Sequence, residues 1–221
     1  MLDVLYEDNH LLAINKRALL ATMGAGAGEP SLVNEAKEYL KSKYDKPGNV
    51  YLGVVSRLDS FVTGVVLFAR TSKAASRLTA QFQSRSVEKT YQALIPQGLR
   101  PESAELVHWI KKLDSQRRMV VCRPDDRQGK EARLRYRTLD HIGDYSMLEI
   151  ELLTGRKHQI RLQLSHTGFP IIGDQKYASD QPFPQGIALH SYQLRFEHPV
   201  QKFPVVIEAD VPYYWPRGTG P

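Results

Sequence analysis

Asp59 is an isolated carboxylate in a position that could do chemistry. No other Asp or Glu lies between Asp45 and Glu88, and apolar stretches flank Asp59 on both sides. With Arg57 two residues before it, a carboxylate at a strand end is an unusual choice for packing alone. A carboxylate in this position could take part in acid–base or nucleophilic chemistry. An Asp that caps a helix or bonds the backbone of a turn is the alternative, and both stay open at this point.

A second group of candidate residues lies in the segment 154–177, TGRKHQIRLQLSHTGFPIIGDQKY. Its basic side chains crowd one end, at Arg156, Lys157, His158 and Arg161. We expect a helix to begin there and to end before Gly168 and Pro170. The apolar alternation over residues 160–164 would fit a strand equally well. Taken alone, the basic residues could form a solvated face.

Tyr91 is the third candidate, in the strand-like stretch VEKTYQAL. A phenol can stack on a planar substrate or take part in proton transfer. A tyrosine on a strand is more often part of a half-buried core, so Tyr91 alone proves little.

The net charge of the chain is concentrated in one stretch. The 221 residues include 30 Lys plus Arg and 24 Asp plus Glu, a formal charge of +6. Residues 111–137 hold ten basic and four acidic side chains, so this stretch carries the whole excess. Within it Arg133, Arg135 and Arg137 alternate, which places three guanidiniums on one face of a strand. They suit a row of contacts to nucleic-acid phosphates, or an exposed strand kept soluble by charge.

Composition excludes several other classes of protein. The single cysteine, Cys122, cannot form an internal disulfide or a cysteine zinc site, and it fits a reducing cytoplasm. No apolar run approaches the roughly 18–20 residues of a spanning helix. The first residues carry acids where a signal peptide would be basic. We therefore expect a cytoplasmic protein that has no contact with membranes.

Motifs for cofactors and metals are missing from the sequence. The glycine-rich residues 23–30 lack the Gly-Lys-Ser/Thr ending of a phosphate loop, which favours a mobile surface loop. The histidine pairs are eight residues apart, unlike helical metal sites. No G-x-S-x-G elbow of a serine hydrolase occurs. We expect no cofactor and no metal.

The elements that would position these residues are strands with few helices. Strand patterns lie at residues 2–6, 11–15, 52–55, 65–69, 89–94, 133–139, 147–153 and 205–209. Helical spacing follows Ser31 and Thr71 or Ser72, with one more helix at 159–166. Without strict alternation of strand and helix, this predicts an α+β fold with a mixed, mostly antiparallel sheet flanked by helices and loops. We expect one domain over residues 1–221.

Taken together, these segments resemble the RluA-type (RluA/RluD-like) pseudouridine synthases. RLDSFVTG, EKTYQAL, TGRKHQIR, GDQKY and LHSYQLRFEHP occur in the family's order and spacing, and YEDNHLLAINK looks like its first hairpin. The likeness covers about residues 2 to 210. It implies the pseudouridine synthase catalytic fold and an isomerase that modifies ribosomal or transfer RNA. We expect no separate N-terminal RNA-binding domain.

The resemblance also implies a role for each candidate residue. Asp59 would be the catalytic aspartate, and Arg161 would pair with it. Tyr91 would stack on the flipped uracil and assist at its C5 atom. Arg57 would help to displace the target base from its stack, a step that costs a few kcal/mol. Arg156, Lys157 and His158, with the arginines of residues 133–137, would contact RNA.

The implied reaction explains why one carboxylate is enough. The N1–C1′ bond of uridine breaks, the uracil turns and C5 rejoins C1′. A glycosidase needs a second carboxylate for water, whereas here the uracil itself recaptures the sugar. A guanidinium keeps a buried carboxylate ionised. Attack of Asp59 at C1′ and proton removal from C2′ are both open routes.

Some residues depart from the family pattern. Ser56 stands where the family usually has His, and Val62-Thr63 stands where it usually has Thr-Ser. Arg17 replaces a common Pro, and Lys157 replaces a Thr. They keep a second hypothesis open, namely an inactive RNA-binding protein on the same scaffold. A glycosidase or nucleotide hydrolase would need a second acid, and the sequence offers none near Asp59. The RNA target and the oligomeric state are not encoded in any motif, and a monomer is the default.

Overall fold

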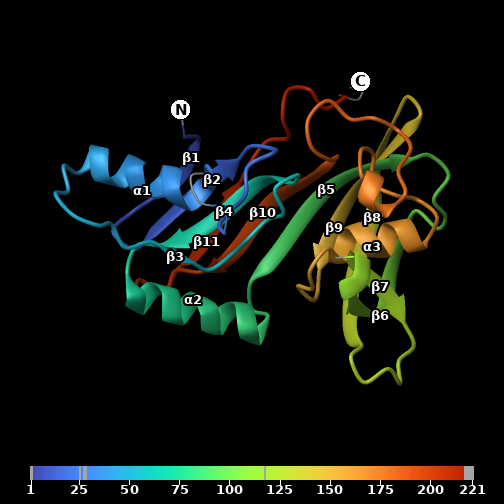
Figure 1. The fold of residues 1–221 in the computed structure, drawn as a ribbon, viewed down its shortest axis with the longest axis horizontal. Coiled ribbons are helices and arrows are strands. Elements are labelled where there is room, and N and C mark those ends of the chain that lie inside the picture. Colours follow the sequence, from blue (N-terminus) through green and yellow to red (C-terminus); the bar gives the residue numbers. More distant parts are fainter. Residues whose placement is uncertain (1, 25, 27–28, 117, 217–221) are drawn as a thin grey trace. The chain divides into compact units, whose positions relative to one another are not determined.

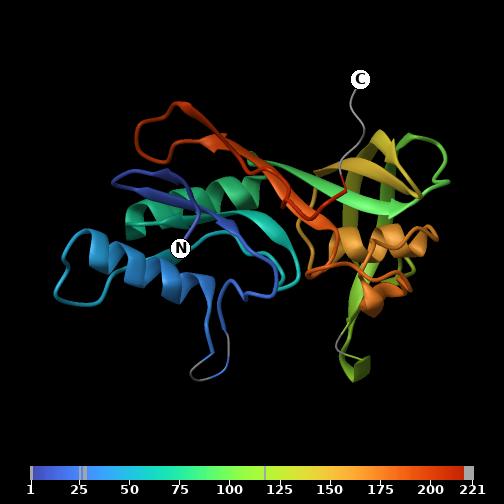
Figure 2. The same ribbon diagram turned by 90° about the horizontal axis from the view of Figure 1, so that it is seen from above.

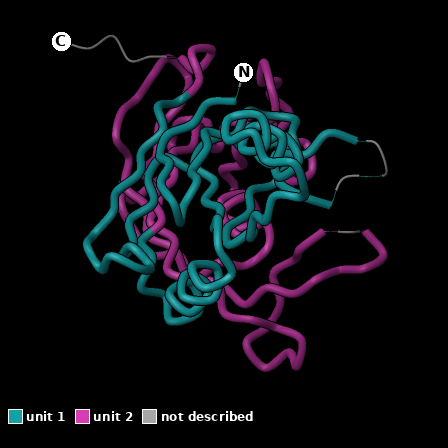
Figure 3. Tube along the Cα trace, turned by 90° about the vertical axis from the view of Figure 1, so that its left-hand side faces the viewer, with its two compact units in different colours: residues 1–88, 191–211 teal, residues 89–190, 212–221 magenta. Residues whose placement is uncertain are grey.

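The computed structural model describes residues 2–24, 26, 29–116 and 118–216. They form two compact units, coloured separately in Figure 3. Unit 1 consists of residues 1–88 and 191–211, and unit 2 of residues 89–190 and 212–221. Each unit is thus assembled from segments that are distant in sequence. The expectation of one catalytic domain over the whole chain stays a prediction.

Unit 1 contains a sheet with one helix on each face (Figures 1 and 2). The strands lie in the order β1, β2, β4, β10, with β3 beside β4 and β11 beside β10. The pairs β1–β2, β2–β4, β3–β4 and β10–β11 are antiparallel. The bounds are β1 Val4–Glu7, β2 Leu11–Lys16, β3 Gly53–Val54, β4 Thr63–Ala69, β10 Leu189–Glu197 and β11 Pro204–Glu208.

The two helices of unit 1 begin at Ser31, as predicted, and at Thr71, one of the two residues predicted for the second helix. The hydroxyl of Ser31 accepts the Asn34 amide at the start of α1 (Leu32–Lys43). The Thr71 hydroxyl does the same for the Ala74 amide at the start of α2 (Ser72–Ser84). Such contacts satisfy amides that have no partner within the helix.

Strand β4 is buried along its whole length because both of its faces are covered. Val65 and Leu67 belong to the apolar cluster that includes Leu78 of α2. Val66 and Phe68, which point to the opposite face, pack in the cluster of α1. The loop that precedes β4 is therefore joined to the best-packed strand of unit 1.

Unit 2 is an antiparallel sheet in the order β5, β9, β8, β6, β7, accompanied by the helix α3 (Figure 1). The bounds are β5 Glu88–Pro96, β6 Ser103–Leu113, β7 Arg118–Cys122, β8 Lys130–Ile142, β9 Tyr145–Leu152 and α3 Gln159–His166. Short 3-10 turns lie at Asp114–Gln116 and Gln175–Tyr177. Leu162 of α3 packs with Ile110 and Ala132 of the sheet.

These elements confirm the predicted α+β class and its mostly antiparallel pairing. The alternative of a strand at residues 160–164 is wrong, because α3 lies there. The alternation was misleading because Gln159, Arg161 and Gln163, which separate the apolar residues, are also buried. The strand expected at 52–55 shortens to Gly53–Val54.

The glycine-rich segment 23–30 is only partly described. Met23, Gly24, Gly26, Glu29 and Pro30 are exposed and lie in neither helix nor strand, as expected of a surface loop. Its mobility stays a prediction. Ala25, Ala27 and Gly28 lie outside the described residues.

Candidate active site

Asp59 lies in the loop between β3 and β4, which hydrogen bonds hold on either side of it. The Val62 amide donates to the Asp59 carbonyl over 3.1 Å and closes a tight turn. Just before Asp59, the Thr22 hydroxyl donates to the Leu58 carbonyl (2.9 Å) and accepts the Leu58 amide (3.1 Å). The backbone at Asp59 is thus fixed by neighbours on both sides, while its side chain is half-buried.

The same loop is anchored to β4 by Ser56. Its hydroxyl accepts the Leu67 amide (2.8 Å) and donates to the Leu67 carbonyl (3.3 Å). Gly64, at the end of RLDSFVTG, has φ +107°, and a Cβ there would lie 2.3 Å from the Ser191 carbonyl oxygen. Only glycine allows β4 and β10 to approach so closely.

Lys16 is a buried cation directly beneath the loop. Its side chain is 1% exposed, and its ammonium donates to the carbonyls of Arg17 (2.9 Å), Leu20 (2.8 Å) and Ser60 (3.1 Å). Burial lowers the pKa of Lys16 to about 7, and the Asp59 carboxylate opposes this effect. Three carbonyls match the three donors of an ammonium. Lys16 therefore ties the turn after Asp59 to the segment that follows β2.

Arg161 in unit 2 is held by a carboxylate. Its Nε and Nη2 donate to the two oxygens of Asp174 over 2.7 and 2.8 Å. Both side chains are buried, and the guanidinium also lies over the Tyr177 ring, 5.1 Å from its centroid. Asp174 and Tyr177 come from GDQKY, whose Gly173 has φ +85° and would place a Cβ 2.6 Å from the Phe183 Cβ. This motif therefore forms the socket for Arg161.

The three basic residues before α3 have different surroundings. The His158 ring nitrogen Nδ1 is 2.8 Å from the Tyr177 hydroxyl, and the backbone of His158 is left-handed. Arg156 is half-buried and donates its Nε to the Glu131 carbonyl (3.0 Å). Lys157 is exposed. Of this basic cluster, His158 thus contacts the socket of Arg161, while Arg156 contacts the start of β8.

Tyr91 lies on β5, opposite Ile150 of β9, and is half-buried. Arg57 is exposed two residues before Asp59. Asp59 and Arg57 belong to unit 1, whereas Tyr91 and Arg161 belong to unit 2. The pairing of Asp59 with Arg161 and the roles of Tyr91 and Arg57 stay predictions.

The three arginines of β8 lie on one face, as predicted, and each has an acidic partner on a neighbouring strand. Glu105 of β6 binds Arg133 (2.8 Å) and Arg135 (3.1 Å), and Glu149 of β9 accepts Arg137 (2.7 Å). The charge count missed these acids because they lie outside residues 111–137. The ion pairs fit the alternative of an exposed strand kept soluble by charge, and an RNA-binding role stays a prediction.

The departures from the family pattern have local explanations. Arg17 forms a two-pronged ion pair with Glu35 (2.7 and 2.8 Å). Val62 is 3% exposed and belongs to the core. The Ser56 hydroxyl is engaged with Leu67. These side chains serve the packing of unit 1.

Sequence reasoning assigned no role to Lys16, Asp174 or Tyr177. A lysine that ends the buried run LLAIN would have been the signal for Lys16, because an unpaired lysine is rarely buried. Among the described residues, no three His, Cys, Asp or Glu side chains gather as a metal site would require. No helix of the described part has the length and apolarity to cross a membrane.

Comparisons with known proteins agree with the motifs. The family model of RNA pseudouridylate synthase matches residues 10–166, which include Asp59, Tyr91 and Arg161. Ribosomal large subunit pseudouridine synthase D of Yersinia pestis is 32% identical, and the namesake of Xylella fastidiosa is 36% identical. Each alignment covers 96% of this chain but only 67% and 66% of those relatives. This chain therefore spans about two thirds of their length.

The fold agrees as well. The structure of human RNA Pseudouridylate Synthase Domain Containing 4 superposes with a TM-score of 0.80, at 23% identity, over 96% of this chain and 89% of that one. This confirms the pseudouridine synthase fold. The chain belongs to the RNA pseudouridylate synthase family, whose members are isomerases.

Proposed function

We propose that this protein converts specific uridines of ribosomal RNA to pseudouridine, with Asp59 as the catalytic carboxylate. The observation that carries the proposal is the loop RLDSFVTG, whose backbone is fixed by hydrogen bonds. It presents the one carboxylate of residues 46–87 on a backbone fixed by Thr22, Lys16 and a tight turn. Tyr91 and Arg161 complete the proposed catalytic set.

The chemistry fits a single carboxylate. The N1–C1′ bond breaks and the C5–C1′ bond forms within the same nucleotide, while the C5 proton leaves and N1 gains one. Water takes no part, so the second acid of a glycosidase is not needed. Lys16 and Asp59 interact electrostatically, and the Asp59 carboxylate opposes the loss of charge that burial imposes on Lys16.

The name of the curated relatives supports ribosomal RNA over transfer RNA as the substrate. On this proposal the protein works in the cytoplasm and without a cofactor. Arg57, Arg156, Lys157 and His158 are proposed RNA contacts. Mapping pseudouridines in total RNA from a deletion strain and its parent names the target, because the target position would lose its modification.

Replacement of Asp59 tests the activity directly. Asp59→Asn keeps the side-chain shape and removes the charge, so we expect turnover to fall on the order of a thousandfold or more while RNA binding survives. Tritium release from RNA labelled at C5 of uridine measures turnover. Asp45→Asn, at an exposed carboxylate after α1, is the matched control.

The outcomes separate the proposal from an inactive RNA-binding protein. Turnover retained by Asp59→Asn would remove Asp59 from the mechanism. No tritium release from the parent protein on any RNA, together with tight binding, would favour the inactive alternative. In an active protein, Tyr91→Phe then shows whether the Tyr91 hydroxyl is needed beyond stacking.

A further inference from the structure

Two groups of basic residues in unit 2 differ in their partners. On β8, Arg133, Arg135 and Arg137 each contact a carboxylate. Arg123 and Arg127 in the loop from β7 to β8, and Lys130 at the first position of β8, are exposed, and no described residue forms an ion pair or hydrogen bond with their side chains. A cation without a protein partner is the one that can bind a phosphate at no cost in broken ion pairs.

The loop that carries these cations is folded rather than loose. Lys111 of β6 binds Asp126 (2.5 Å), and Asp126 also accepts the Gln128 amide (2.9 Å). The Gly129 amide donates to the Asp126 carbonyl (2.9 Å), where a Cβ on Gly129 would lie 3.0 Å from that oxygen. Asp126 is therefore neutralised by Lys111, which leaves Asp125 as the remaining acid of the loop.

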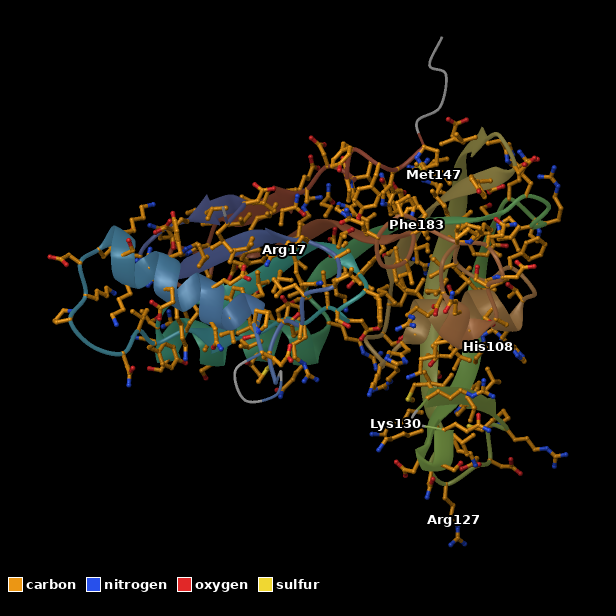
Figure 4. All side chains as sticks on the ribbon, turned by 45° about the horizontal axis from the view of Figure 1, so that its top comes forward. Arg17, His108, Arg127, Lys130, Met147 and Phe183 are labelled. Carbon is orange, nitrogen blue, oxygen red and sulfur yellow. The ribbon has the colours of Figure 1, made fainter. Side chains whose placement is uncertain are left out.

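The start of β8, where the loop ends, contacts the segment that precedes α3. The contact of Arg156 with the Glu131 carbonyl joins the start of α3 to the start of β8, next to Lys130. Lys157, beside Arg156, is exposed. In Figure 4 Lys130 and Arg127 lie at the end of the β6–β8 strands, and Arg127 points outward from it. The exposed cations thus extend from the start of α3 to the tip of the loop.

We propose that this surface, made of Lys157, Lys130, Arg123 and Arg127, binds the phosphate backbone of RNA that flanks the target uridine. The proposal rests on RNA being the substrate. It assigns RNA docking to these exposed cations, which have no ion-pair partner among the described residues, rather than to the arginines of β8, which are paired with carboxylates. Arginine forks and a lysine ammonium are the side chains that bind phosphates.

The two sets of cations offer a matched test. R123Q/R127Q/K130Q and R133Q/R135Q/R137Q remove the same charge from the same unit, so a difference between them reports contacts and not net charge. Both are made in the Asp59→Asn protein, which binds without turning over. Affinity for a fragment of large-subunit ribosomal RNA is measured from 50 to 300 mM salt.

The slope of log affinity against log salt falls by about 0.7 for each lost phosphate contact on a single strand. We expect the loop variant to lose about 2 in slope and the β8 variant less than 1. Equal slopes, or a larger loss in the β8 variant, would overturn the proposal. The proposal would also be overturned if polyglutamate displaced the bound RNA as effectively as unlabelled RNA does, since that would indicate an acidic protein as the partner.

Turnover of the parent protein is judged separately. If the parent releases no tritium but the loop variant still loses slope, the activity fails and the RNA surface stands. If the parent is active and the slopes are equal, only the surface fails.

Discussion

Each unit contains a buried cation beside or among its proposed catalytic residues, and the two cations are stabilised in opposite ways. Lys16 supports the Asp59 loop of unit 1 through three carbonyl oxygens. Arg161 of unit 2 has a carboxylate, Asp174, that binds it with both oxygens. A compact ammonium matches three separate acceptors, whereas a planar guanidinium matches the parallel oxygens of a carboxylate.

This difference decides which of the two cations responds to pH. The carbonyls are neutral, so burial can remove the charge from Lys16 near neutral pH. An arginine keeps its charge at any pH that proteins tolerate. Of the two cations, Lys16 near the proposed catalytic carboxylate is therefore the one that titrates near neutral pH, and Arg161 keeps its charge.

Breaking the Arg161 pair has the largest expected effect on stability. Asp174→Ala leaves a guanidinium that is 4% exposed without this partner, and we expect a loss of about 4 kcal/mol. Urea denaturation measures it, with Asp180→Ala in the same segment as the exposed control. A loss below about 1 kcal/mol would show that Asp174 is not what holds Arg161.

Removing the lysine has the next largest effect. Lys16→Met fits the space but leaves the carbonyls of Arg17, Leu20 and Ser60 without their donor, at a cost of about 3 kcal/mol. We also expect slower turnover, because the turn after Asp59 loses its tie. Lys41→Met on the exposed face of α1 is the control for both measurements. Wild-type stability in Lys16→Met would mean that those carbonyls are satisfied otherwise.

The pH dependence of stability distinguishes Lys16 from Arg161, and it is the smallest of the three expected effects. The pKa of Lys16 is about 7 in the folded protein, against 10.5 for a lysine in water. Between these values only the unfolded chain keeps the proton, so stability rises with pH. We expect wild type to gain about 2 kcal/mol over Lys16→Met between pH 7 and 9. Denaturation of both proteins at pH 6, 7, 8 and 9 checks this, and parallel curves would contradict it.

The positive charge of residues 111–137 is partly neutralised by acids from other strands. The excess in residues 111–137 is real in the sequence, but β6 and β9 bring Glu105 and Glu149 against it. Strand neighbours are distant in sequence, so a count over a window cannot include them. The cations with free access are instead those of the loop around Arg127.

The sequence by itself determined the fold class, the helix cap at Ser31 and the family, and it narrowed the second cap to Thr71 or Ser72, because these depend on local periodicity and on ordered motifs. It also singled out Asp59, Tyr91 and Arg161 as candidates. Only the tertiary structure decided what holds them. Lys16 meets Ser60 across 44 residues and Arg161 meets Asp174 across 13, and such contacts follow from how strands and loops pack. The alternation of α3 misled for the same reason, since burial of Gln159, Arg161 and Gln163 depends on partners that no local pattern contains.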